Sequence, residues 1–155
     1  MWINTPESKE IVKEFSKELI AEIAPEEIGL VDELLEDYYA NPNMQPSKDN
    51  PLGFGSEILA ASTPVVAMAL QVLFNYIITE VWTSAQKEGA AVIAQKVKKL
   101  INPEPHKTEP ALGLDQEQLK KAKQLIKKEA MRGGMNSKKA EDFALKLVAR
   151  IALKS

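Results

Sequence analysis

The sequence predicts an all-α fold, a helical bundle around one long apolar central helix with a helical hairpin at the C-terminus. Three observations support this prediction. Apolar residues recur at steps of three and four along most of the chain, and residues 58–79 contain no charged side chain. No stretch shows the strict alternation of a half-buried strand. With 155 residues, 45% of them hydrophobic, the chain can bury a substantial core in one domain.

The first helix is predicted near residues 7–23. Thr5 supplies a capping hydroxyl, Pro6 suits the first turn, and Glu7 adds a favourable charge there. The apolar residues of this helix form one stripe: Ile11, Val12, Phe15, Leu19 and Ile23.

Pro25 ends the first helix and begins a second one, which we expect to reach about residue 40. Its apolar stripe consists of Ile28, Val31, Leu34, Leu35 and Tyr38. Its outer face is strongly acidic and comprises Glu26, Glu27, Asp32, Glu33, Glu36 and Asp37.

Residues 41–56 hold three prolines and two glycines among polar residues, which predicts a long loop. The central helix follows a short turn at residues 57–61, with Thr63 as its cap and Pro64 in its first turn; the alternative is a continuous helix kinked at Pro64. No strong helix breaker follows before Asn102-Pro103, and a single glycine, Gly89, is tolerated within a helix. We therefore expect one helix of about 38 residues, near 57 Å long at ~1.5 Å per residue.

Residues 102–113, with three prolines, predict a stiff linker between residues 1–101 and a basic tail, residues 114–155. In the tail, Asp115 caps one helix that Gly133-Gly134 stops, and Asn136 or Ser137 caps the last. A hairpin of about 40 residues is too small to be stable alone, so it must dock on the rest or on a second copy. The residues expected to dock it are Phe143, Leu147 and Ile151.

Charge is distributed unevenly along the chain. Residues 1–57 carry 4 basic and 13 acidic side chains, a net charge of −9, whereas residues 80–155 carry 16 basic and 9 acidic side chains, a net charge of +7. This polarity favours head-to-tail association or an oriented membrane contact. In the alternative interpretation, the two ends fold against each other and neutralise locally.

On a helical wheel, the polar residues of the apolar run lie within roughly 80° of one another; they are Gln71, Asn75, Thr79 and Gln86. The rest of the circumference needs cover from protein or from lipid. Four amphipathic helices of the same chain can supply protein cover in a bundle.

The lipid alternative also has support. The 22 uncharged residues are long enough to span a bilayer, and Tyr76 and Trp82 lie near the C-terminal end, where an aromatic belt would sit. Lysines are more frequent after the run than before it, which predicts a cytoplasmic C-terminal side. In either environment we expect a seam of interaction formed by Gln71, Asn75, Tyr76, Thr79 and Trp82.

The sequence offers no credible catalytic, cofactor or metal site. It has no Cys, and its one histidine, His106, lies in the Pro-rich linker. Glu33, Glu36 and Asp37 share a helical face that could attract a divalent cation, but a solvated acidic face is the better interpretation. The glycines of residues 53–56 lack the lysine and strand of a phosphate-binding loop.

The basic tail has the outline of a helix-turn-helix, but its lysines lie opposite the apolar stripe, as on any soluble helix, which argues against nucleic acid. No small-molecule substrate is indicated. We expect a cytoplasmic, non-catalytic interaction or assembly protein that self-associates or binds a protein partner. The alternative is a small single-pass membrane effector or anchored adaptor with residues 58–79 in the bilayer. The first twenty residues show no secretory signal.

Overall fold

The computed structural model describes residues 2–40, 62–83, 85–101 and 113–151. These residues form six α-helices with short 3-10 and π-helical turns and no β-strand, which confirms the all-α prediction. The α-helices are α1 (Pro6–Ile23), α2 (Val31–Ala40), α4 (Ser62–Tyr76), α5 (Ala90–Ile101), α6 (Gln116–Arg132) and α7 (Ser137–Arg150). The turns are η1 (Trp2–Asn4), η2 (Pro25–Leu30), the π-helical η4 (Ile77–Val81) and η5 (Ala85–Lys87).

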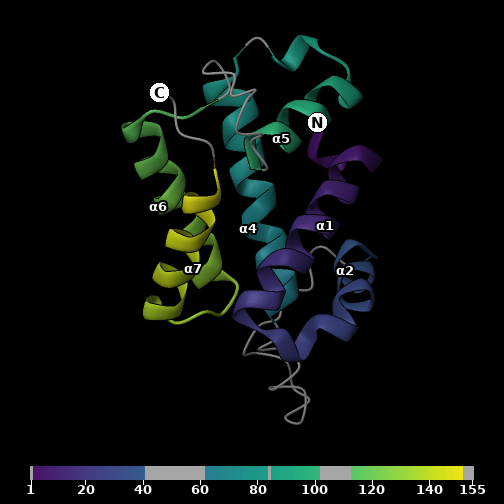
Figure 1. The fold of residues 1–155 in the computed structure, drawn as a ribbon, viewed down its shortest axis with the longest axis vertical. Helices are drawn as coiled ribbons and strands as arrows, with labels where there is room; N and C mark the ends of the chain where they lie inside the picture. The colour runs from purple at the N-terminus through teal and green to yellow at the C-terminus, as the bar shows by residue number, and fades with distance from the viewer. Residues whose placement is uncertain (1, 41–61, 84, 102–112, 152–155) are drawn as a thin grey trace.

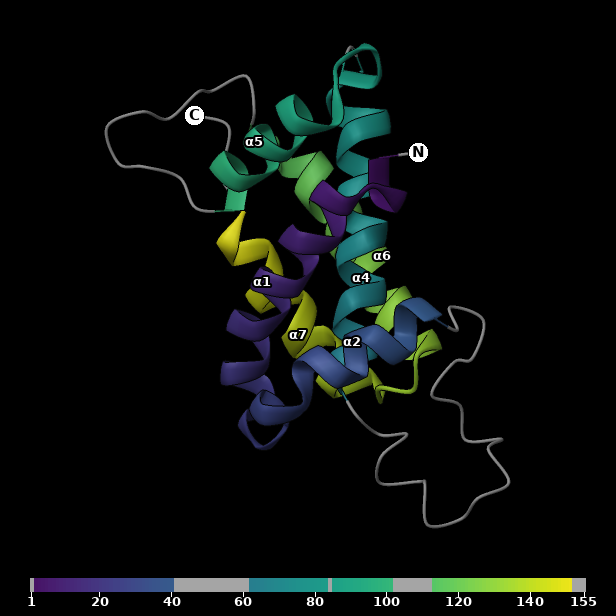
Figure 2. The same ribbon diagram turned by 90° about the vertical axis from the view of Figure 1, so that its right-hand side faces the viewer.

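Helix α4 lies at the centre of the bundle (Figure 1). Helices α1 and α2 lie on one side of it, and α6 and α7 lie on the other. The view turned by 90° agrees, because α2 lies in front of α4 while α6 and α7 lie behind it (Figure 2). Helix α4 packs directly against α1, α2 and α6, and α7 packs against α6. These contacts are consistent with the predicted bundle, although the α-helix at its centre has 15 residues and is shorter than predicted.

The composition of α4 explains its central position. Eleven of its fifteen residues are buried, so it has no broad polar face to present to water. One continuous core joins it to the helices on both sides, and Phe15 of α1, Phe74 of α4 and Phe143 of α7 are all fully buried in it. The C-terminal hairpin thus shares its core with the rest of the chain.

The prediction of a single helix from Pro64 to Ile101 is wrong. The backbone widens into the π-helical turn η4, and the N–H of Trp82 donates to the carbonyl of Ile77 as the helix ends. Helix α5 starts after Gly89, whose carbonyl accepts from the N–H of Ile93. Because α5 turns back, its apolar stripe packs against α1; a straight continuation would have left that stripe without cover.

Most of the predicted helix caps are present. The Thr5 hydroxyl accepts from the N–H of Ser8, Asp115 forms a reciprocal capping box with Gln118, and the Asn136 side chain accepts from the N–H of Lys139. Helix α6 ends at Gly133-Gly134, where Gly134 has a φ of 113°. These local signals were reliable because each cap depends on residues within one turn.

The start of the second helix differs from the prediction. Residues Pro25–Leu30 form the 3-10 turn η2 instead of an α-helical turn, so Ile28 points away from the core and is 45% exposed. The same turn carries Glu27, predicted on the outer acidic face, inward to the start of α4. Its carboxylate accepts from the N–H groups of Ser62 and Thr63 at 2.8 and 2.9 Å, and from the Thr63 hydroxyl at 2.9 Å. Thr63 is therefore a capped residue, where the sequence predicted it as the cap.

Candidate functional site

Gln71, Asn75 and Thr79, the predicted polar seam, lie on successive turns of α4 and η4, and all three are partly buried. These three residues do not form one continuous exposed surface. The Tyr38 hydroxyl of α2 donates to Gln71 Oε1 at 2.8 Å, so Gln71 contributes to packing between α2 and α4. Gln86 lies beyond the end of this helix, in η5.

Asn75 and Thr79 lie between two surface hollows. The first has a volume of about 390 Å³, and its other lining residues are Trp2, Ile3, Thr5, Ile78, Glu88, Ala90 and Ile93. The second, about 460 Å³ and located between α4 and α6, is also lined by Val72, Tyr76, Glu80, Lys121 and Leu125. The Thr79 hydroxyl donates to the Asn75 carbonyl at 2.8 Å. Only these two seam residues border both hollows.

Tyr76 and Trp82, the aromatic members of the predicted seam, are both buried. Trp82 lies at the end of η4, where the helix breaks, and Tyr76 lines the second hollow. The structure thus brings Asn75, Tyr76 and Thr79 to one hollow and places Gln71 against α2. A role of these five residues in binding a partner stays a prediction.

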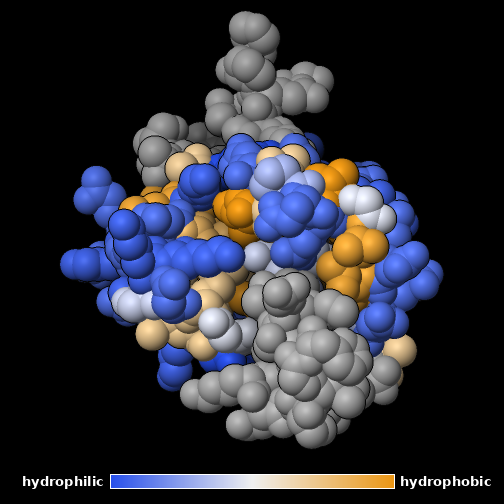
Figure 3. Space-filling view, turned by 90° about the horizontal axis from the view of Figure 1, so that it is seen from below, coloured by the Kyte–Doolittle hydropathy of each residue, from blue (hydrophilic) through white to orange (hydrophobic). Residues whose placement is uncertain are grey.

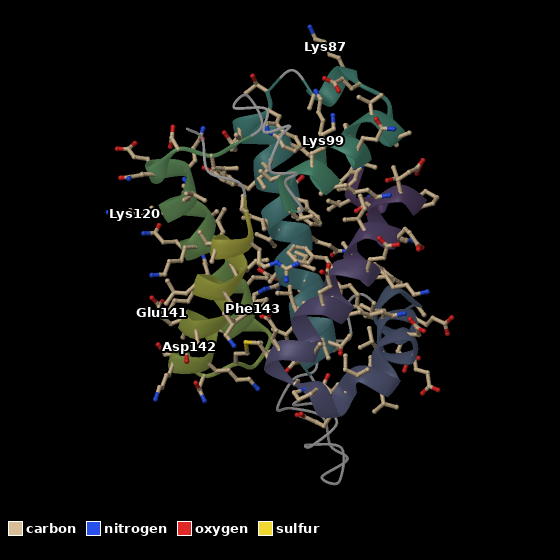
Figure 4. The ribbon with its side chains drawn as sticks, viewed as in Figure 1. Lys87, Lys99, Lys120, Glu141, Asp142 and Phe143 are labelled. Carbon is tan, nitrogen blue, oxygen red and sulfur yellow. The ribbon has the colours of Figure 1, made fainter. Side chains whose placement is uncertain are left out.

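The three predicted docking residues of the tail, Phe143, Leu147 and Ile151, are buried within the shared core. Figure 4 shows Phe143 pointing from α7 toward the interior, whereas Lys120 of α6 points outward. Arg150, which sequence reasoning did not single out, joins α7 to α1. Its guanidinium lies 5.0 Å from the centre of the Phe15 ring and donates to Glu18 at 3.0 Å.

Most ion pairs between helices join two acidic helices or two basic helices. Lys13 and Lys17 of α1 pair with Asp32 of α2, and Lys123 and Lys127 of α6 pair with Glu141 of α7. The hydrogen bond from Lys17, with Lys13 nearby, lowers the pKa of Asp32, and those from Lys123 and Lys127 lower the pKa of Glu141.

Among the ion pairs between described residues, one joins the acidic helices to the basic tail, Arg150 with Glu18. Helix α4 lies between α2 and α6, whereas α1 and α7 meet at Arg150 (Figure 1). Local neutralisation of one end by the other, the alternative that the sequence left open, is therefore slight in the part of the chain that the structure describes.

Burial raises the pKa of Tyr76, a member of the seam, and of two neighbouring tyrosines of α2 beside it. Burial raises the pKa of Tyr38, and burial together with the nearby Tyr38 raises the pKa of Tyr39 to about 12. The buried Tyr39 hydroxyl has no hydrogen-bond partner among the described residues. Both tyrosines stay protonated at neutral pH, so neither can act there as a general base.

Across the described ranges, no three Asp, Glu, His or Cys side chains lie close enough together to hold a metal ion. Glu33, Glu36 and Asp37 are exposed on α2. His106 and the glycine-containing segment 53–56 lie outside the described residues.

Residues Ser62–Val81 form a helix of 20 residues that is long and apolar enough to cross a membrane by length and composition. Much of it is buried by the other helices of the chain. The comparisons with known proteins add no assignment: no family model matches the chain, and neither the curated proteins nor the solved structures gave a significant match.

Proposed function

We propose that this protein is a non-catalytic helical interaction and assembly module that acts in the cytoplasm through self-association or through a protein partner. The separation of charge across the apolar core carries this proposal. Residues 2–40 hold 3 basic and 11 acidic side chains, a net charge of −8, and residues 114–151 hold 10 basic and 5 acidic side chains, a net charge of +5. Opposite faces with such charges steer molecules toward one another in a fixed orientation.

Exposed apolar side chains give the proposal a second support. Large apolar residues that reach the surface are Ile28, Leu30, Val92, Met131 and Leu145, each at least 44% exposed. Single exposed apolar residues are ordinary. Four of these five, however, belong to the acidic η2 segment or to the basic helices α6 and α7, where they could be buried by a docked partner.

Analytical ultracentrifugation of the purified protein over a wide range of concentration tests this proposal. We expect a concentration-dependent oligomer that weakens as salt rises from about 50 to about 500 mM, because the screening length shortens several-fold. Immobilised protein serves as a parallel test for a protein partner. A strict monomer at every concentration and salt, with no protein retained by the immobilised chain, would contradict the proposal.

A membrane role is the second candidate, and the length and composition of Ser62–Val81 are the observation that favours it. This candidate requires α4 to leave its neighbours and enter the bilayer. Fractionation of the native protein with and without detergent separates the two candidates. A membrane protein stays in the pellet through a carbonate wash, whereas complete recovery in the detergent-free soluble fraction would end the membrane proposal.

A further inference from the structure

Glu33 and Asp37, one turn apart on α2, form an exposed row with Leu30, the last residue of the preceding turn η2, and Glu36 lies beside them. Their carboxylates form no ion pair with any described residue, unlike Asp32, which Lys13 and Lys17 occupy. We call these four residues the acidic row.

Helix α6 carries a matching row of opposite charge. Lys120, Gln124, Lys128 and Met131 follow one another at steps of four, four and three residues, and all four are exposed. Neither lysine of this row forms an ion pair with another described residue, whereas Lys123 and Lys127 of the same helix pair with Glu141. We call these four residues the basic row.

When the two helices are antiparallel, the rows place apolar residues opposite each other and acidic residues opposite or beside basic ones. Leu30 then faces Met131, and Glu33, three residues later, faces Lys128, three residues earlier. Asp37 falls beside Gln124, between Lys120 and Lys128. Leu30 and Met131 are 49% and 44% exposed, so the contact would also bury one apolar pair.

The two rows do not face each other within one molecule, because α2 lies in front of α4 and α6 behind it (Figure 2). Lys120 points away from that helix (Figure 4). The end of the molecule seen from below, where η2 and the α6–α7 turn lie, shows apolar patches between hydrophilic side chains (Figure 3). The complementary row for each would have to come from a second molecule.

We propose that the acidic row of one copy binds the basic row of a second copy, with α2 and α6 antiparallel. This inference rests on the self-association branch of the proposed function. Because the two rows occupy different faces, each copy keeps one row free after the first contact. The contact is thus heterologous and builds chains or closed rings instead of a single two-fold dimer.

Paired charge reversals test this contact. One variant carries Glu33→Lys and Asp37→Lys, and the other carries Lys120→Glu and Lys128→Glu. Each variant alone presents two rows of the same sign, so its self-association should weaken by at least about tenfold, since like charges in contact repel. An equimolar mixture has complementary rows again and should associate with nearly the wild-type affinity.

A matched control changes the same net charge elsewhere. Glu10→Lys with Glu14→Lys alters two exposed carboxylates of α1 outside the acidic row, and it should leave association within about threefold of the wild type. Circular dichroism verifies that every variant is folded. Recovery on mixing is the decisive result, because a defect in folding cannot be repaired by a second defective variant.

Two results would overturn the inference. If the wild type self-associates and both reversal variants do so equally well, another surface holds the copies together, and the proposed assembly function stands without this contact. If the wild type is a monomer at all concentrations and at low salt, the contact does not form, and the function must depend on a different protein partner.

Discussion

Glu27 is the most informative single residue to change, because one carboxylate from η2 holds the start of the central helix. In Glu27→Ala, the N–H groups of Ser62 and Thr63 and the Thr63 hydroxyl lose their acceptor. Ser62 and Thr63 are buried, so water cannot easily replace the carboxylate. A lost N-cap costs about 0.5–2 kcal/mol, and the lost hydroxyl bond and helix-end charge add about 1 kcal/mol or more.

We therefore expect Glu27→Ala to lower the free energy of unfolding by about 2–3 kcal/mol, and Glu27→Gln, which keeps a carbonyl acceptor, by about half as much. Urea unfolding followed by circular dichroism measures this loss as a midpoint lowered by about 1–1.5 M, with little change in slope. Glu26→Ala, an exposed acid of the same turn, is the control and should cost at most about 0.5 kcal/mol. Equal losses in the Glu27→Ala and Glu26→Ala variants would refute the capping role.

Three further predictions address the core and the tyrosines. Gln71→Leu should lower the free energy of unfolding in urea by about 1 kcal/mol, because the Tyr38 hydroxyl loses its acceptor. Adding Tyr38→Phe to the same chain should restore most of this loss, and additive losses would contradict the prediction. Phe143→Ala should cost about 3–5 kcal/mol, because Phe143 is 1% exposed, whereas Leu145→Ala at 49% exposure should cost under about 0.5 kcal/mol. Because burial raises the pKa of Tyr39 from 10.0 to about 12, the free energy of unfolding should fall as the pH rises through that interval. Tyr39→Phe should make this fall smaller in alkaline unfolding experiments, and an unchanged fall would exclude Tyr39 as its cause.

The features predicted correctly from the sequence are those that depend on neighbours along the chain. The capping of α1 by Thr5 and of α6 by Asp115, and the stop at Gly133-Gly134, each involve residues within a turn or two. The burial of Phe143 followed from its place in an apolar stripe, and the central position of α4 followed from its lack of a polar face.

The features that were missed depend on contacts between distant segments. Glu27 is 35 residues from Ser62 in the sequence, and nothing in its own neighbourhood distinguishes it from the solvated acids beside it. No proline in the sequence marks the break after Trp82. By turning back, α5 packs its apolar stripe against α1, a contact that only the tertiary arrangement shows. Gly89, judged tolerable within a helix, marks the beginning of α5.

The competition between bilayer and bundle can be weighed from the same contacts. The ten Ile, Leu, Val and Phe residues of segment 58–79 would gain about 3–6 kcal/mol in a membrane, and Gln71 and Asn75 would offset part of that gain. Removing α4 from the bundle would expose the stripes of α1 and α6, including the buried Phe15, Leu19 and Ile126.

Exposure of each such side chain to water costs about 1.5–3 kcal/mol, so three of them already offset the gain from insertion. Helix α4 therefore stays in the bundle because its removal would expose apolar side chains of α1 and α6 to water, and because it is itself apolar. Insertion would require a membrane surface or a partner that covers the abandoned stripes of α1 and α6 at the same time.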